Sequence, residues 1–207
     1  MNTNINMASS MSVAGNLEIL NTGTGYLVVG QTTLNVGGDC IVSDSFRLAT
    51  SVRTINITGD LVVNGGKFDL SGANVVGTVN LTGDFYLTAG SITETSGGSG
   101  LIVFNKSNGV QNYIFTGGSV SGVINFTVSN TTTLQMDSEG YLEGGGTCTL
   151  SAGATLGVTS ADGISTSGAT GNVRTAGRVF LAGSNLIYNG DVDQVAGSGL
   201  ANTTKAN

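Results

Sequence analysis

The chain has 207 residues, of which 39% are apolar and only 10% are charged, and it contains no proline, histidine or tryptophan. Its net charge of −6 at pH 7 would repel a nucleic-acid backbone, and its apolar fraction is too high for a disordered Gly/Ser-rich chain. No stretch approaches the ~20 apolar residues of a membrane span. We therefore expect an ordered protein without a nucleic-acid partner and without membrane insertion.

The first ten residues, MNTNINMASS, lack the basic start and apolar run of a secretory signal. Ile5, Met7, Met11 and Val13 alternate with polar residues, which predicts a further strand-bearing turn and not a terminal cap. The low charge and the abundance of Thr, Ser, Asn and Gly favour a mature piece of an exported protein whose signal lies upstream.

Alternation of apolar and polar residues continues along the chain and predicts half-buried β-strands. Glycine-containing pairs between the strands supply the backbone angles that corners require. The clearest strand segments are NLEIL (16–20), TLNV (33–36), TINITGDLVV (54–63), KFDLS (67–71) and TVNLTGDFYL (78–87). Their inward residues are expected to be Leu34, Val36, Ile55, Ile57, Leu61, Val63, Phe68, Leu70, Val79, Leu81, Phe85 and Leu87.

A loose motif recurs along the chain: glycine, then Asn, Asp or Thr, then an apolar residue or cysteine. It begins at Gly15, Gly38, Gly59, Gly83, Gly146, Gly171 and Gly190. The interval of 63 residues from Gly83 to Gly146 counts as three steps of 21, so the 175 residues from Gly15 to Gly190 make eight steps of about 22 residues each. This spacing predicts a right-handed parallel β-solenoid of about nine turns, forming a single domain over 1–207. A β-sandwich is the alternative, but it gives no reason for a motif to return at this period.

In such a solenoid the residues after the motif glycines would stack at one corner, namely Asn16, Asp39, Asp60, Asp84, Asn172 and Asp191. Two interpretations compete. A column of carboxylates suits calcium, whereas Asn and Asp also support tight corners by bonding to the backbone. With about one carboxylate per turn, the structural corner is favoured, and MDSEG (136–140) and GDVD (190–193) are interpreted as solvated turns.

One inward column is expected to hold Leu17, Cys40, Leu61, Phe85, Cys148, Val173 and Val192. Cys40 and Cys148 would then lie about five turns apart along the axis, too far for a disulfide. We expect two buried, reduced thiols, and two cysteines without histidine exclude a zinc cluster.

Catalytic chemistry finds little support. The absence of histidine excludes Ser–His and Cys–His pairs. Paired acids could cleave a polysaccharide, and Glu94, Asp137, Glu139 and Glu143 are candidates by residue type alone, because nothing in their spacing brings them together. We therefore assign no catalytic, cofactor-binding or metal-binding residue and expect no cofactor and no enzyme activity.

An ice-binding face would need a regular threonine ladder, and Thr32-Thr33, Thr93/Thr95 and Thr131–Thr133 fall at irregular places. Glycan binding would be favoured by a line of exposed aromatics drawn from Tyr26, Tyr86, Tyr113, Tyr141 and Tyr188.

ETSGGSG (94–100) and SADGISTSGATG (160–171) are predicted loops. LANTTKAN (200–207) offers little apolar surface for a cap, so we expect neighbouring protein to cover at least one end.

The segment GGGTCTLSAGATLGVTSADGISTSGATGNVRTAGRVFLAGSNLIYNGDVDQVAGSGL (144–200) resembles β-strand-repeat surface proteins of the Bacteroidota type, as does 78–130. The tail GLANTTKAN (199–207) is more polar than the strand that usually follows such a block. The resemblance implies export by type IX secretion and a role in adhesion or surface structure, and it brings no catalytic or ligand residues.

Together these observations predict a non-catalytic structural or adhesive segment of a longer extracellular, cell-surface protein. Its expected partners are neighbouring solenoid turns or copies end to end, secretion machinery or surface glycans. A glycan-binding or polysaccharide-cleaving solenoid is the alternative.

Overall fold

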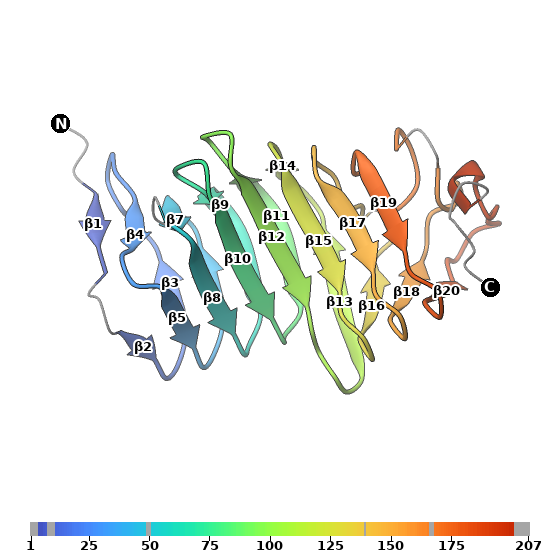
Figure 1. The fold of residues 1–207 in the computed structure, drawn as a ribbon, viewed down its shortest axis with the longest axis horizontal. Helices are drawn as coiled ribbons and strands as arrows, with labels where there is room; N and C mark the ends of the chain where they lie inside the picture. The colour runs from blue at the N-terminus through green and yellow to red at the C-terminus, as the bar shows by residue number, and fades with distance from the viewer. Residues whose placement is uncertain (1–3, 8–10, 49–50, 139, 166–167, 201–207) are drawn as a thin grey trace.

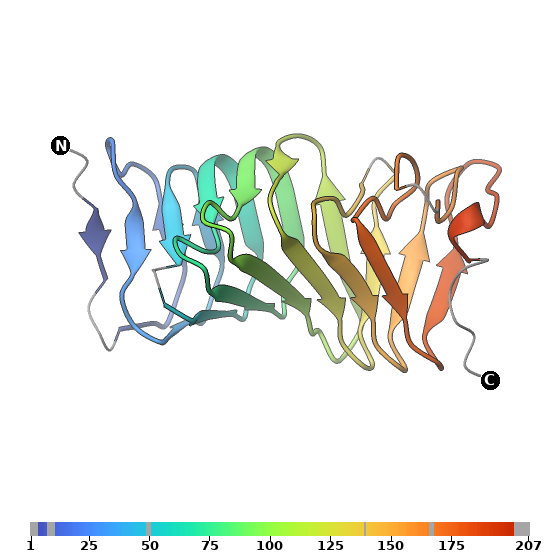
Figure 2. The ribbon, with the colours of Figure 1, turned by 45° about the horizontal axis from the view of Figure 1, so that its top comes forward.

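The computed structural model describes residues 4–7, 11–48, 51–138, 140–165 and 168–200. The named strands all pair in parallel, each with its counterpart one turn further along the chain (Figure 1). A complete turn contributes a strand or part of a strand to each of three faces, which stack along the rod (Figure 2). The three faces enclose one apolar core. The prediction of an all-β parallel solenoid is confirmed.

The first face is formed by β1 (Ile5–Asn6), β4 (Leu27–Val29), β7 (Phe46–Leu48), the second halves of β9 (Leu61–Asp69) and β11 (Phe85–Thr93), and β14 (Ser119–Val120). The second face is the 8-stranded sheet of β2 (Ser12–Val13), β5 (Thr33–Val36), β8 (Arg53–Ile57), β10 (Val76–Leu81), β12 (Ser99–Phe104), β15 (Ile124–Val128), β17 (Thr147–Leu150) and β19 (Gly177–Phe180). The third face is formed by β3 (Leu17–Ile19), β6 (Cys40–Val42), the first halves of β9 and β11, β13 (Val110–Phe115), β16 (Thr133–Met136), β18 (Thr155–Val158) and β20 (Asn185–Tyr188). A short 3₁₀ helix, η1 (Ser198–Leu200), follows the last strand.

Two nine-residue strands, β9 and β11, each serve two faces because glycine bends them at a corner. Gly66 has φ of 57° and Gly90 has φ of 74°, a region that side chains with a Cβ rarely adopt. The register of β9 with β11 shifts around Ala89, at the same corner. The bend lets one continuous strand leave the third face and enter the first.

The interior confirms the pattern of alternation. All twelve predicted inward residues between Leu34 and Leu87 are at most 1% exposed. The middle of the rod is filled by aromatic rings: Phe85 stacks on Tyr113 at 4.6 Å between ring centroids, and Phe104 stacks on Phe126 at 6.4 Å. Period-2 patterning therefore placed these side chains on the correct side of their strands.

The predicted number of turns is wrong. About six turns are complete, with a strand on every face, and in the two rungs that follow the first face is reduced to one isolated bridge between Leu142 and Val173. The positions that pair in succession along the second face are Val13, Val36, Ile57, Leu81, Phe104, Val128, Leu150 and Phe180. The step from Leu150 to Phe180 is the longest of the series, so the regular period ends before the last rung.

The error arose from the glycine motif. Gly15, Gly38, Gly59 and Gly83 do share one corner, because each backbone N–H after the first bonds to the glycine carbonyl one turn before. Gly146 instead precedes β17 on the second face, Gly171 is bridged to Ile164, and Gly190 follows β20. Cys148 and Val173 are buried but lie outside the expected inward column, and Val192 is 58% exposed. Only Leu17, Cys40, Leu61 and Phe85 are in register.

The predicted loops are partly confirmed. Residues 94–98 form no strand, but β12 already begins at Ser99. In 160–171 the described residues form only the isolated bridge at Ile164, whose side chain is fully buried. This segment therefore folds against the stack, where Ile164 N–H donates to Ala196 O at 3.2 Å.

Candidate functional site

The predicted carboxylates support turns. Three of them accept a backbone N–H: Glu94 from Ser96 at 3.2 Å, Asp137 from Phe115 at 3.0 Å and Glu143 from Val120 at 3.0 Å. The fourth, Glu139, lies outside the described residues. Asp137 and Glu143 do share a neighbourhood. Burial, followed by the charges of Glu143 and Asp137, raises the pKa of the core residue Tyr113 well above its usual value.

A ladder of Asx side chains runs along the corner that precedes the third face. Asn16 Oδ1 accepts from the backbone N–H of Asp39 at 2.9 Å, Asp39 Oδ1 from that of Asp60 at 2.8 Å, and Asp60 Oδ1 from that of Asp84 at 2.7 Å. Each side chain thus joins its turn to the next one. Among the described residues no three acidic, cysteine or histidine side chains gather as a metal-ligand group. The geometry supports the structural corner over the calcium column.

Two predicted members do not belong to this ladder. Asn172 is buried and organises another region: its Oδ1 accepts from the N–H groups of Thr159 and Ser160, both at 2.8 Å, and its Nδ2 donates to Gly140 O at 2.6 Å. Asp191 is exposed beyond β20. The prediction placed them by a glycine neighbour, which indicates a turn but not which corner of the solenoid it forms.

The ladder ends on Asp84, whose ionisation should influence stability. Its Oδ1 accepts from Asn112 N–H at 3.0 Å, its Oδ2 from Asn112 Nδ2 at 2.8 Å, and Lys106 Nζ lies 3.4 Å from Oδ1. Burial alone would raise the pKa of Asp84, but the bonds from Asn112 and the charge of Lys106 outweigh burial and hold that pKa below its usual value.

Because the folded-state pKa is lowered, ionised Asp84 stabilises the fold above its unfolded pKa of about 3.9 and loses this effect as the pH falls through the folded value. We expect Asp84→Asn to lower the free energy of unfolding by roughly 1–2 kcal/mol at pH 7 and to weaken its fall in acid. Urea unfolding as a function of pH measures this, with the exposed Asp193→Asn as the control. An unchanged acid dependence in Asp84→Asn would contradict the assignment.

The two cysteines are buried and unpaired, as predicted. Cys40 lies on the third face between Leu17 and Leu61, whereas Cys148 lies on the second face between Phe126 and Arg178. Burial raises the pKa of Cys40 to about 12, and it raises the pKa of Cys148 to about 12 as well, despite the nearby charge of Arg178. Both are packing residues and not nucleophiles.

We expect neither thiol to react with a thiol-specific reagent in the native protein, even at pH 9, because the thiolate is the reactive form and both pKa values lie near 12. In denaturant both should react. An exposed Thr116→Cys variant, titrated in the same way, is the positive control. Rapid native labelling of either wild-type cysteine would show that the core opens or that a thiol is accessible.

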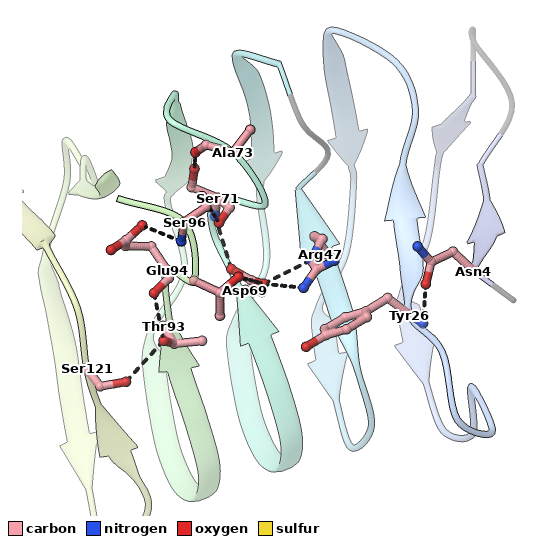
Figure 3. Close-up of polar contacts among 11 residues, drawn as sticks. Asn4, Tyr26, Arg47, Asp69, Ser71, Ala73, Thr93, Glu94, Ser96 and Ser121 are labelled. Atoms are coloured by element: carbon pink, nitrogen blue, oxygen red, sulfur yellow. Dashed lines mark hydrogen bonds and ion pairs between the residues drawn. The ribbon is translucent and has the colours of Figure 1, made fainter. Parts of the chain in front are cut away.

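A polar cluster lies on the outer side of the first face (Figure 3). Asp69 is fully buried, and its Oδ2 accepts from Arg47 Nε at 2.9 Å, Arg47 Nη2 at 2.8 Å and Thr95 Oγ1 at 2.7 Å. Arg47 Cζ lies 3.8 Å from the centroid of the Tyr26 ring. Ser71 N–H donates to Asp69 Oδ1 at 3.3 Å. This cluster links successive turns from Tyr26 to Thr95. Sequence reasoning missed it because its partners lie on different turns and are far apart along the chain.

The tyrosines do not form a line that could stack on sugars. Tyr113 is buried in the core, and Tyr26 is covered by Arg47. Tyr141 is held between Phe115, at 4.5 Å between ring centroids, and Arg174, whose Cζ is 3.8 Å from the ring centroid. Tyr86 and Tyr188 are half-buried on the third face, where β13, β16 and β18 lie between their strands. The line of exposed aromatics that would have favoured the glycan-binding alternative is therefore not formed.

The outer surface of the second face carries regular columns of side chains. The first column is Thr33, Thr54, Thr78, Leu101, Asn125 and Thr147, and the second is Asn35, Asn56, Asn80, Val103, Thr127 and Thr149. A third column, at the strand ends, is Thr58, Thr82, Asn105, Ser129 and Ser151, each with its N–H bonded to the preceding turn. We name these columns the Thr/Asn surface.

Most of the threonines considered for an ice-binding ladder in the sequence lie outside the Thr/Asn surface. Of those residues only Thr33 belongs to the Thr/Asn surface, while Thr131 is a turn residue with φ of 67°. The signal that could have found the surface is the T-x-N triplet at 33–35, 54–56 and 78–80, because residues i and i+2 of a strand point to the same side. Among the features described above, this surface is the strongest candidate for a binding site.

No family model, curated protein or solved structure matches the chain. Within the described residues, no helix has the length and apolarity that crossing a bilayer requires.

Proposed function

We propose that this chain is a non-catalytic structural and adhesive repeat segment of an exported bacterial cell-surface protein. The observation that supports this most strongly is the continuity of its turn-to-turn connections. Backbone pairing follows each face, and the Asx ladder from Asn16 to Asp84 adds a side-chain bond at every step of one corner. A stack of this kind forms a stiff spacer, in which each turn depends on its neighbours.

The resemblance of 78–130 and 144–200 to Bacteroidota-type surface proteins supports the cellular setting of this proposal. It suggests extracellular display after type IX secretion, with further domains in the parent chain. The low charge and the Thr- and Asn-rich outer side chains suit a protein that works outside the cell.

We further propose that the ends of the solenoid contact other protein, either neighbouring solenoid turns or further copies of the chain stacked end to end. Within the part of the chain that the structure describes, the N-terminal strands β1, β2 and β3 are each paired on one side only, and Ile5, Met11 and Leu20 are exposed there. The other end is partly covered, since Leu200 packs against the core and Gln194 Nε2 donates to Val158 O at 2.9 Å. The tail 201–207 lies outside the described residues.

We expect the purified chain to associate as its concentration rises, and Ile5→Lys to weaken this association about tenfold, because a charge on an edge strand opposes strand addition. Sedimentation velocity measures it. Val76→Lys, an exposed position midway along the rod, is the matched control and should behave as wild type. A wild-type chain that stays monomeric at high concentration would show that the ends cap themselves.

Surface display is tested on intact cells of the source organism. An antibody against the chain should label unpermeabilised cells, and a protease added outside should remove the signal while a cytoplasmic marker survives. Labelling that requires permeabilisation would overturn the proposal.

A further inference from the structure

The Thr/Asn surface differs from the rest of the exterior because none of its members is charged or aromatic. The other faces carry the carboxylates of the Asx ladder and the Arg47–Asp69 ion pair. The strands that bear the surface, β5 to β17, lie side by side across the molecule (Figure 1). The columns of the Thr/Asn surface are thus uncharged, and Arg53, which begins β8, lies at their edge.

The surface repeats in two directions. Successive turns lie ~4.8 Å apart, and side chains two residues apart along a strand are separated by ~6.6 Å. The Cα register is unbroken through Thr33, Thr54 and Thr78, and likewise through Asn35, Asn56 and Asn80. A ligand that is itself a repeating lattice of matching spacing can therefore contact many equivalent positions of the surface at once.

Side-chain hydrogen bonds fix part of this array. Asn56 Nδ2 donates to Asn35 Oδ1 at 2.8 Å, and Asn80 Nδ2 donates to Asn56 Oδ1 at 2.8 Å. Such ladders hold neighbouring strands in register and oppose twisting of the sheet. The asparagines are therefore ordered before any ligand arrives, which lowers the entropic cost of binding a rigid partner.

The chemistry of the columns selects the ligand. Each threonine presents a methyl group beside a hydroxyl that both donates and accepts, and Leu101 and Val103 continue the columns with apolar groups. A charged lattice would find no counter-charge here. A crystalline polysaccharide would find no aromatic ring on which its sugar faces could stack. Ordered water in an ice surface is neutral, offers both donors and acceptors, and repeats over distances of this range.

We propose that the Thr/Asn surface is an ice-binding site, whose ligand is the ordered water layer of an ice crystal. Threonine methyl groups and the Leu101 and Val103 side chains order water next to the protein, and the hydroxyls anchor that water in register with the crystal. The proposal goes beyond the structural role and does not depend on cell-surface display, because the purified chain alone tests it.

The test uses the purified chain, ice recrystallisation in frozen sucrose solution, and a fluorescently labelled sample that marks ice planes. Wild-type protein should inhibit recrystallisation and coat specific planes. Thr54→Lys and Thr78→Lys should each raise the concentration needed for inhibition about tenfold, because a hydrated charge interrupts the surface. Thr88→Lys, an exposed threonine on β11 outside the Thr/Asn surface, is the matched control and should act as wild type.

Circular dichroism establishes that each variant is folded, and Thr58→Lys, in the more exposed third column, replaces either variant that is not. Wild-type protein that inhibits no more than serum albumin would overturn the proposal. So would full inhibition by folded Thr54→Lys and Thr78→Lys, or binding to crystalline cellulose or chitin without any effect on ice. The intact-cell labelling described above succeeds or fails independently of these results.

Discussion

Replacing Phe104 by alanine is expected to lower the free energy of unfolding by roughly 3–5 kcal/mol, the largest loss predicted for a single core residue. The Phe104 ring lies in the middle of the rod, where it meets rings from three other strands. It stacks on Phe126 at 6.4 Å and meets Phe85 and Tyr113 edge-on, each at 6.1 Å between centroids. Alanine would leave a cavity that the parallel strands around it cannot close, because their spacing is fixed by hydrogen bonds.

Urea unfolding followed by circular dichroism measures the change. Phe104→Leu is the matched control and should cost less than half as much, since it keeps most of the buried volume. A loss below about 1 kcal/mol for Phe104→Ala would show that the aromatic cluster is loosely packed or that this part of the rod does not limit stability.

Replacing Asp69 by alanine is expected to lower the free energy of unfolding by roughly 3 kcal/mol, because it leaves a guanidinium and a hydroxyl without their shared acceptor. Asp69 is fully buried, whereas the Arg47 side chain keeps 22% of its exposure, so water partly compensates the arginine. The loss should exceed that for Asp84→Asn, which removes a charge from a more accessible position.

A double-mutant cycle with Arg47→Met and Asp69→Leu tests the coupling. The double variant should be more stable than Asp69→Leu alone, because removing both partners leaves no unpaired charge. A loss on Asp69→Leu that is the same in the wild-type and Arg47→Met backgrounds would mean that the ion pair contributes nothing and that Asp69 acts only through Thr95 and Ser71.

Local pattern predicted the strands well and their positions in the stack less well. Alternation in TINITGDLVV identifies which side chains point inward because the side-chain period of a strand is 2 whatever surrounds it. The glycine motif identifies turns, but every corner of a solenoid needs such a turn. Gly15 to Gly83 therefore share a corner, while Gly146 and Gly171 satisfy the same local demand elsewhere.

The number of turns was overestimated because one step of the solenoid contains an insertion. The bridge between Leu142 and Val173 encloses a longer stretch of chain than the earlier steps. This stretch contains SADGISTSGATG (160–171), which is predicted as a loop but still counts toward the mean period. A mean period computed across that insertion assigns too many turns. Loop length costs little free energy, and a solenoid accepts such insertions at its corners.

The Thr/Asn surface can be recognised only when the register between neighbouring strands is known. T-x-N triplets occur at 33–35, 54–56, 78–80 and 170–172, and the first three become a surface only when Thr33, Thr54 and Thr78 stand in line. The Arg47–Asp69 pair joins two neighbouring turns and is likewise invisible until the turns are stacked. Sequence order does not record which turn faces which.

A measurement of the register between turns therefore tests the stacked solenoid and its Thr/Asn surface most directly. In nuclear Overhauser spectra of the soluble chain, the methyl protons of Thr54 should give cross-peaks to those of both Thr33 and Thr78, because one turn separates each pair by ~4.8 Å. Thr33 and Thr78, two turns apart, should give none. Absence of both neighbouring cross-peaks, or cross-peaks that join Thr54 to residues offset from Thr78, would contradict the stacked solenoid and with it the Thr/Asn surface.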